Sequence, residues 1–446
     1  MNRQYVAAVA LWLAACTDVA GPRPRPGAPA DSVNGPGGTG LVWYSLEPRV
    51  ISLGQTDSVR VSAVINGSGS AVVITRSGEQ YSLRRAGTQY SASLPISALL
   101  SDLRPGDLHT VGAQIALSGE STRTNISFNI RDGSLPNVAV RALVPGVQAT
   151  DRILNLRVDS ATVSTTVSSA LMREVYRHLF DNYDFVAVVE AVRSSRKATY
   201  LGVRNNITGV GLTQFDNTVQ YGSAGRLQGI LQFPSDDVYD LGATSSLRVL
   251  GERWMNFTRV GLLSVSRPHW PLSSLAYGVM GLGSGANSQS IPFPYQLTQV
   301  SNGYRLDATE PATEFNDFEL YLMGLLPAQQ VRAGVVFRDQ GLIASVRNGA
   351  VIAGPVDSVH INDIIAIEGP RNPPFSTTQP TFRIATVVLS LGRLLSAQEL
   401  AFYDHMAARG ETETVLAYVQ GLTRGQTRPL FLATGQRARL NARLGQ

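Results

Sequence analysis

Residues 41–135 are organised in short runs in which apolar and polar side chains alternate. Residues 59–64 read Val-Arg-Val-Ser-Ala-Val, and Asn66-Gly67 follows them as a turn signal. Alternation with a period of two is typical of half-buried β-strands. Similar runs are found at residues 71–75, 81–84, 89–94, 110–117 and 124–130. Short strands at this spacing predict an immunoglobulin-like β-sandwich over residues 41–135.

Beyond residue 136, helical and strand patterns follow one another, which predicts an α+β domain over residues 136–356. Strand candidates are found at residues 138–144, 153–158 and 185–192. A first helix is predicted over residues 165–180, with an apolar face made of Leu171, Met172, Val175, Tyr176, Leu179 and Phe180. A second is predicted over residues 244–257, where helical spacing relates Leu247, Leu250, Gly251, Trp254 and Thr258.

Residues 357–446 predict a mixed C-terminal α/β extension that is mainly helical. Residues 382–389 form one clear strand candidate. Ser396 and Glu399 have the spacing of a capping box, and Gly410 ends the helix that starts there. Residues 411–420 are predicted to form another helix.

The first 40 residues predict export and a lipid anchor. Arg3 precedes a short apolar run that ends in Leu-Ala-Ala-Cys, with Cys16 last. This run is shorter than the ~20 residues that span a bilayer. It resembles a bacterial lipoprotein signal peptide, residues 1–16, in which Cys16 carries the lipid; an ordinary secretory signal is the alternative. Residues 17–40 are rich in Gly and Pro and predict a flexible tether.

Composition narrows the functional classes. Hydrophobic residues make up 43% of the chain, which excludes wholesale disorder. The net charge of +5 comes largely from arginines after Glu413, so a general nucleic-acid surface is not expected. The single lysine, Lys197, is not part of a Gly-Lys-Ser/Thr sequence, which excludes a P-loop. Cys16 is the only cysteine, so no disulfide can form within the chain.

Several short sequence blocks over residues 150–446 resemble an uncharacterised family of exported bacterial proteins related to zincin metallopeptidases. Their order along the chain also agrees with that family. The blocks lie at residues 181–185, 203–206, 221–229, 250–254, 269–270, 278–281, 319–324, 368–371 and 433–435.

The resemblance implies a helix that carries His-Glu-x-x-His, in which two histidines hold zinc and the glutamate activates water. The corresponding positions here are Arg248, Val249 and Glu252. An arginine offers no lone pair to a metal, and a valine transfers no proton. In the same comparison His269 takes the place of a third ligand, and Met280 that of a Met-turn. The zinc motif is therefore degenerate, and no catalytic residue is predicted.

Other readings of the candidate residues stay open. His269 and Glu252 could form a poor cation site, although a hydrogen-bonded structural His269 is the plainer interpretation. Glu319, on a helix predicted over residues 315–325, is either a ligand or a cap-linked carboxylate. Three clustered acids could bind Ca²⁺ weakly or cap a turn: Asp236, Asp237 and Asp240. Gly-x-Ser-x-Gly does not occur.

Two functional classes follow from these patterns. The first is a lipid-anchored cell-envelope protein that binds or scaffolds a protein or peptide through a degenerate peptidase-like domain, without a cofactor. The second is an active zinc metallohydrolase with a non-standard ligand set. The i, i+4 spacing of Arg248 and Glu252 also predicts an ion pair where zinc would otherwise be held.

Overall fold

The computed structural model describes most of the chain beyond residue 40. The described residues are 40–52, 56–67, 69–75, 77–99, 109–119, 123–131, 137–159, 167–194, 196–234, 245–255, 257–281, 294–309, 312–345, 347–375, 380–414 and 429–445. Cys16, the tether and the acidic cluster at residues 236–240 lie outside them. No helix in the described ranges is long and apolar enough to cross a membrane.

The N-terminal part is a β-sandwich of two five-stranded sheets, as the alternating pattern predicts. Its strands alternate inward and outward side chains, and Val59, Val61 and Ala63 are fully buried. One sheet pairs β1 (Leu41–Glu47), β3 (Ser58–Ile65), β7 (Gln89–Pro95) and β6 (Arg84–Ala86). The other pairs β2 (Val50–Ser52), β9 (Arg123–Arg131), β8 (His109–Leu117), β4 (Ala71–Thr75) and β5 (Gln80–Ser82). The immunoglobulin-like assignment stays a prediction.

The first sheet of the sandwich is completed by a strand from the following part of the chain. Strand β14 (Arg193–Ser194) pairs with β1 in antiparallel register, so that Trp43 faces Ser194. Trp43 and Val192 are both buried and form a small hydrophobic cluster of their own. The sandwich thus shares a sheet and a cluster with the α+β part.

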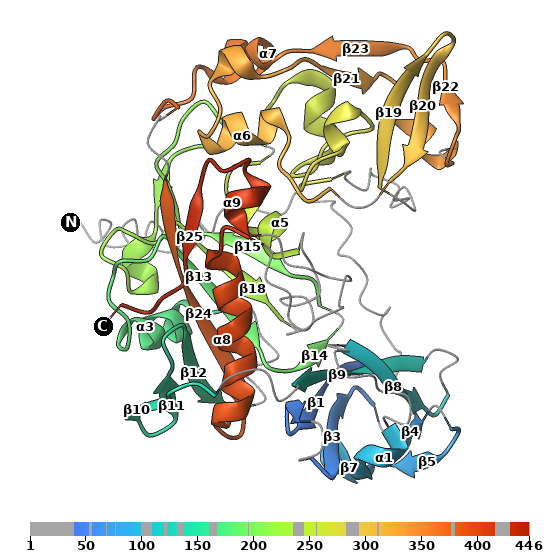
Figure 1. The fold of residues 1–446 in the computed structure, drawn as a ribbon, viewed down its shortest axis with the longest axis vertical. Helices are drawn as coiled ribbons and strands as arrows, with labels where there is room; N and C mark the ends of the chain where they lie inside the picture. The colour runs from blue at the N-terminus through green and yellow to red at the C-terminus, as the bar shows by residue number, and fades with distance from the viewer. Residues whose placement is uncertain are drawn as a thin grey trace, which may run out of the picture. The chain divides into compact units, whose positions relative to one another are not determined.

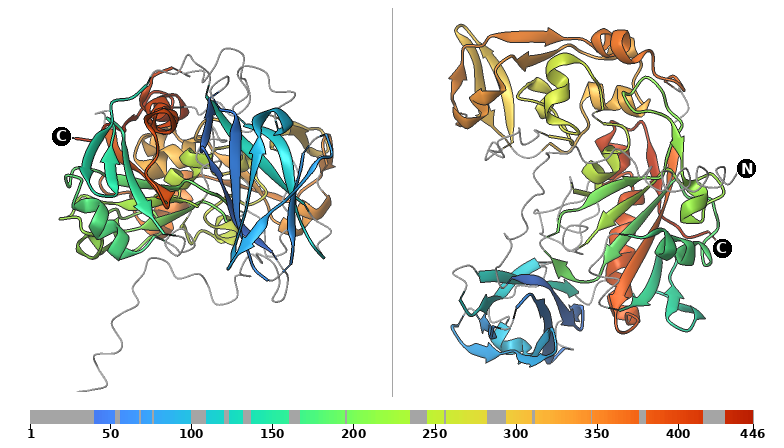
Figure 2. Two further views of the ribbon diagram at one scale, coloured as in Figure 1. Left: turned by 90° about the horizontal axis from the view of Figure 1, so that it is seen from below. Right: turned by 180° about the vertical axis from the view of Figure 1, so that it is seen from behind.

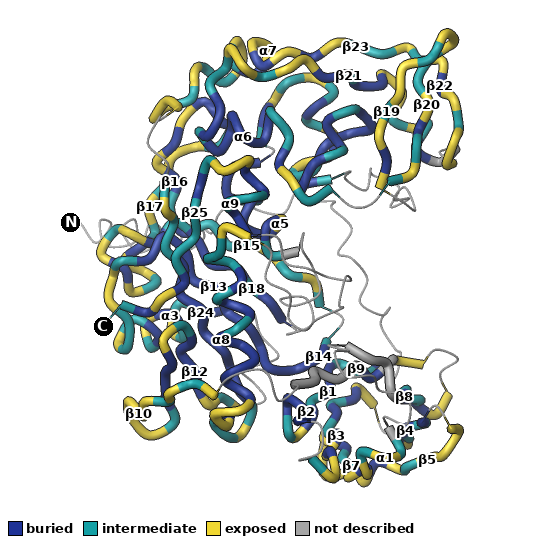
Figure 3. The backbone as a smooth tube through the Cα atoms, in the orientation of Figure 1, coloured by how far each residue is buried: buried dark blue, intermediate teal, exposed yellow. Residues whose placement is uncertain are grey.

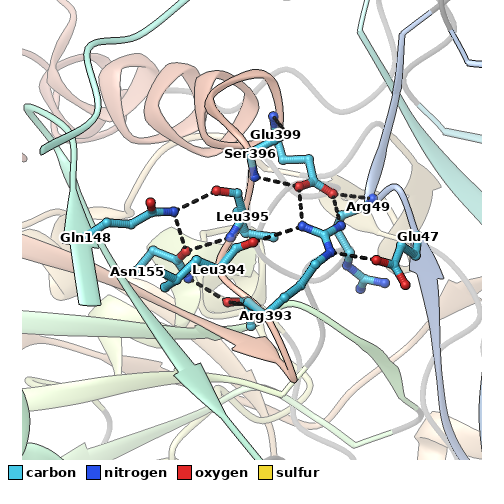
Figure 4. Close-up of polar contacts among 10 residues, drawn as sticks. Glu47, Arg49, Gln148, Asn155, Arg393, Leu394, Leu395, Ser396 and Glu399 are labelled. Carbon is cyan, nitrogen blue, oxygen red and sulfur yellow. Dashed lines mark hydrogen bonds and ion pairs between the residues drawn. The ribbon is translucent and has the colours of Figure 1, made fainter. Parts of the chain in front are cut away.

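A polar network continues this junction. The backbone N–H of Arg49 donates to Glu399, and Arg393 contacts both Glu399 and Glu47 (Figure 4). Glu399 lies at the start of α8 (Ala397–Glu411), where it also completes a capping box with Ser396. The capping box predicted at this position is therefore present.

The α+β part is built on a mixed sheet in which four neighbouring strands run parallel. Its order is β10 (Arg141–Val144), β11 (Val147–Ala149), β12 (Ile153–Val158), β24 (Thr381–Leu391), β13 (Phe185–Glu190), β18 (Gly229–Phe233) and β15 (Thr199–Gly202). Strands β12, β24, β13 and β18 are parallel, and β15 is an antiparallel edge strand. Strand β24, from the predicted C-terminal extension, lies in the centre of the sheet (Figure 1).

Both faces of this sheet are covered, which explains the continuous apolar run in β13. Phe185, Ala187 and Val189 point into the larger core, together with residues of α8 and of α5 (Ser245–Gly251). Val186 and Val188 point to the opposite face, into the core that contains α3 (Ser169–Tyr176). The helices therefore lie on opposite sides of the sheet (Figure 2), and the strands between them are buried (Figure 3).

A further group of elements is formed mainly by residues 295–368. It contains the hairpin β19 (Tyr295–Val300) and β20 (Gly303–Ala308), joined by β22 (Val351–Ile352), and the pair β21 (Gly334–Phe337) and β23 (Val356–Val359). Helices α6 (Asp317–Met323) and α7 (Ile361–Glu368) belong to the same group. Helix α9 (Leu430–Ala433) and strand β25 (Arg439–Asn441) return to β24 and α8.

Two predicted helices are shorter in the structure. Helix α3 ends at Tyr176, and Phe180, which the pattern places on the apolar face, is 57% exposed. Helix α5 ends at Gly251 rather than near residue 257. The predicted helix at residues 411–420 falls mainly outside the described residues, although Thr412 already has an extended backbone.

Candidate functional site

The positions that correspond to the zinc motif lie on α5 or directly after it, next to the loop of residues 269–281. Met280, the Met-turn candidate, is fully buried, and its Sδ atom lies beside Gly251. A Cβ atom at residue 251 would approach this sulfur to 2.6 Å, so glycine is needed for the contact. The end of α5 and the residue 269–281 segment are therefore packed directly together.

Arg248 is held by the same segment through His269. The Nη2 atom of Arg248 lies 2.8 Å from Nε2 of His269, and Nδ1 of His269 lies 2.7 Å from the carbonyl oxygen of Met280. Arginine only donates, so Nε2 accepts and Nδ1–H donates to Met280. Burial, together with the charge of Arg248, lowers the pKa of His269 to about 4. His269 is therefore neutral at pH 7, with a fixed tautomer.

Glu252 is bound on the other side, to the edge strand of the main sheet. Its Oε2 atom accepts a hydrogen bond of 3.2 Å from the backbone N–H of Tyr200 in β15. Burial raises the pKa of Glu252 to about 7, and the Tyr200 N–H and the charge of Arg248 only partly oppose this effect. The protonated form of Glu252 is therefore more favoured than that of a solvent-exposed glutamate.

The predicted ion pair between Arg248 and Glu252 does not form. Among the hydrogen bonds and ion pairs of the described residues, Arg248 contacts His269, and Glu252 contacts Tyr200. Both side chains do lie on one side of the helix end, as their spacing requires. Each has a closer tertiary partner that the helical pattern alone does not reveal.

Glu319 is a cap-linked structural carboxylate. It is fully buried near the start of α6, where it forms a capping box with Asn316. Its Oε1 atom accepts from Nε1 of Trp270 at 2.8 Å and from the N–H of Met280 at 3.2 Å. Its Oε2 atom accepts from the N–H of Asn316 at 2.9 Å. Burial raises its pKa to about 7, against these hydrogen bonds. Glu319 thus ties the residue 269–281 segment to α6.

Several of the sequence blocks that carry the resemblance meet in a polar cluster around Arg253. The sequence pattern did not predict this cluster. Arg253, the second residue after α5, is 1% exposed. Its Nε atom donates to Oε1 of Gln228 at 3.2 Å, and its Nη1 atom donates to Oδ1 of Asn205 at 3.0 Å. Arg371 donates to the last carbonyl groups of α6, at Leu322 and Met323. Residues from five separate blocks meet here. The only sequence signal for this cluster was that each of its residues lies in one of these blocks.

The candidate metal ligands do not assemble into a site. Within the part of the chain that the structure describes, no three His, Cys, Asp or Glu side chains form a group that could hold a metal ion. The Nε2 lone pair of His269 is engaged by Arg248, and Glu319 is saturated by N–H donors. Val249, at the position of the general base, is buried in the main core. These residues do not fit a catalytic zinc ion.

Comparisons of the chain with protein-family models, with curated proteins and with solved structures find no match.

Proposed function

We propose that the protein is an exported, lipid-anchored protein of the bacterial cell envelope whose zincin-like domain binds or scaffolds a protein or peptide without hydrolysing it. One observation carries this proposal: the guanidinium of Arg248 donates to the Nε2 atom through which His269 would bind a metal. The neutral tautomer of His269 is stabilised by this bond and by the Met280 carbonyl. The arrangement stabilises a metal-free form of these positions.

The surroundings of these residues support the same proposal. Two contacts hold residues of the matching blocks around the helix: Met280 packs against α5, and Trp270 donates a hydrogen bond to Glu319. The positions that correspond to the two zinc-binding histidines and the general base, in contrast, hold Arg248, half-buried Glu252 and buried Val249. A scaffold retained without its ligands and base favours recognition over hydrolysis.

Zinc loading tests the proposal. The full-length protein, incubated with excess zinc and freed of unbound ions by gel filtration, is expected to retain no stoichiometric zinc. Chelators are expected to leave its melting temperature unchanged, because no metal stabilises the fold. The double variant R248H/E252H is the comparator, since it places two imidazoles at the end of α5 and directly after it while Val249 stays buried. Stoichiometric zinc in the wild type, with chelator-sensitive peptide hydrolysis, would contradict the proposal.

The lipid anchor makes a separate prediction about localisation. A Cys16→Ala variant is expected to move from the membrane fraction to the soluble fraction, because it lacks the thiol that carries the lipid. Its circular dichroism spectrum and melting temperature should match the wild type. Thr17→Ala is the matched control and should stay with the membrane. If Cys16→Ala remains membrane-bound as an intact chain, the anchor assignment is wrong.

A further inference from the structure

Arg253 is a buried cation whose hydrogen-bond partners are all neutral. Its side chain bonds to the amide oxygens of Asn205 and Gln228, and the ring of Trp254 lies 6.0 Å from its guanidinium carbon. Its Nη2 atom is buried and has no hydrogen-bond partner in the described part of the chain. A buried charge normally has an oppositely charged partner, because water has been removed from it. Arg253 therefore needs an explanation.

A second arginine with neutral partners lies in the same cluster. Arg371 donates to the carbonyl oxygens of Leu322, Met323 and Pro373. Burial and the positive charge of Arg253 together lower the pKa of Arg371 to about 10, so the two guanidinium groups repel each other. Among the described residues, no carboxylate shifts the pKa of Arg253 or of Arg371.

The tyrosine beside Arg253 does not supply the missing negative charge. Burial raises the pKa of Tyr200 far above neutrality, so its hydroxyl group stays protonated. Its hydroxyl donates to the carbonyl oxygen of Gln228. Arg204, whose charge also acts on Arg253, is itself positive and is paired with Asp216 at 3.2 Å.

One loop holds the two arginines together. The side-chain amide of Asn205, which accepts from Arg253, donates to carbonyl oxygens at both ends of the residue 205–213 loop. In the same loop Thr208 exchanges two backbone hydrogen bonds with Asn372. Gly209 has a φ of +76°, and a Cβ atom there would lie 2.4 Å from the carbonyl oxygen of Pro370. The loop therefore fixes the Arg371 segment closely against the Arg253 side.

We propose that Arg253 and Arg371 form a site for a small inorganic oxyanion of the phosphate or sulfate class. The anion would accept hydrogen bonds from Nη2 of Arg253 and balance both positive charges, because charge-assisted hydrogen bonds from a guanidinium group to an oxyanion are strong. Arg253 is 1% exposed, which excludes a phosphate group carried on a larger molecule and leaves a free inorganic ion as the proposed ligand. This site is independent of the degenerate zinc positions.

Titration of the full-length protein with inorganic phosphate and with sulfate, after dialysis into a buffer free of both, tests the site. Calorimetry is expected to show saturable binding of one equivalent, with a rise in melting temperature that follows the same isotherm. Arg253→Met keeps the length of the side chain and removes the charge, so its affinity should fall about 100-fold. Arg259→Met is the matched control, because Arg259 is exposed and already paired with Glu368; it should bind as the wild type.

The melting temperatures provide a second signature. Without anion, Arg253→Met should melt at or above the temperature of the wild type, because an unpaired buried charge has been removed. In saturating phosphate the wild type should be the more stable of the two. The absence of saturable binding to the wild type overturns the site, even if Arg253→Met fails to fold. A thermal effect of equal size in the wild type and in folded Arg253→Met also overturns it, since that is a general salt effect.

Discussion

Replacing Glu399 by alanine is expected to lower the free energy of unfolding by about 3 kcal/mol, because buried donors lose their acceptor. Glu399 is 1% exposed and receives the backbone N–H of Arg49 at 2.6 Å and two N–H groups of Arg393 at 2.8 Å. It also accepts from the N–H of Ser396 at 2.8 Å, which caps α8. Urea unfolding at pH 7 measures the loss.

Glu47→Ala is the control for this substitution. Glu47 contacts the same guanidinium of Arg393, but its side chain is 54% exposed. Exposed ion pairs contribute less than about 1 kcal/mol, so this variant should be nearly as stable as the wild type. Equal losses in the two variants would show that the buried acceptor at residue 399 has no special role.

The effect of Glu399 should also depend on pH. Burial alone would raise the pKa of Glu399, but the hydrogen bonds from Arg393, Ser396 and Arg49 outweigh it, so the pKa lies below its ordinary value. Its stabilisation is therefore complete above the pKa of the unfolded carboxyl group and is lost as the pH falls through the lower pKa of the folded state. The stability difference between Glu399→Ala and the wild type should shrink below pH 4.5.

The local strands of this fold could be predicted from the sequence, but their neighbours could not. The run at residues 153–158 predicts β12 with its observed bounds, and residues 382–389 predict most of β24. The alternation of apolar and polar residues indicates which face of a strand is buried. It does not indicate that β24 pairs between β12 and β13, although β24 begins more than 190 residues after β13 in the chain. The domain boundary expected near residue 356 therefore separates strands that share one sheet.

Helix ends were less predictable because tertiary contacts decide them. The spacing of apolar residues extends the second helix to residue 257, whereas α5 ends at Gly251, where Met280 packs against the backbone. At α8 the start signal is local, and the capping box of Ser396 and Glu399 is present as predicted; Gly410, the predicted stop, lies within the helix, which continues to Glu411. Local capping chemistry was thus more informative than periodicity.

The site residues themselves, but not their partners, could be found from the sequence. His269, Met280 and Glu319 lie in the blocks that resemble zincins, and Arg248 lies two residues before one of them; the structure links these residues through hydrogen bonds and packing. Helical spacing predicted that Arg248 would pair with Glu252. The pair fails because an imidazole and an edge-strand N–H, both distant in sequence, compete successfully for these groups.

Replacing Glu319 by alanine is expected to lower the free energy of unfolding by about 4 kcal/mol, because several buried N–H groups lose their acceptor at once. Glu319 is fully buried, and its carboxylate receives the indole N–H of Trp270 and the backbone N–H groups of Met280 and Asn316. The loss of the capping box at Asn316 accounts for about 1 kcal/mol of this total. Thermal and urea unfolding measure the effect.

Glu319→Gln separates the structural role from a role in binding metal. Glutamine keeps the volume and one acceptor oxygen, but its NH₂ group faces N–H donors, so about half of the loss should remain. Added zinc should not change the stability of Glu319→Gln, Glu319→Ala or the wild type, because the carboxylate is saturated by donors from the protein. If zinc stabilises the wild type and this stabilisation disappears in Glu319→Gln, then Glu319 is a ligand and the active-hydrolase alternative regains support.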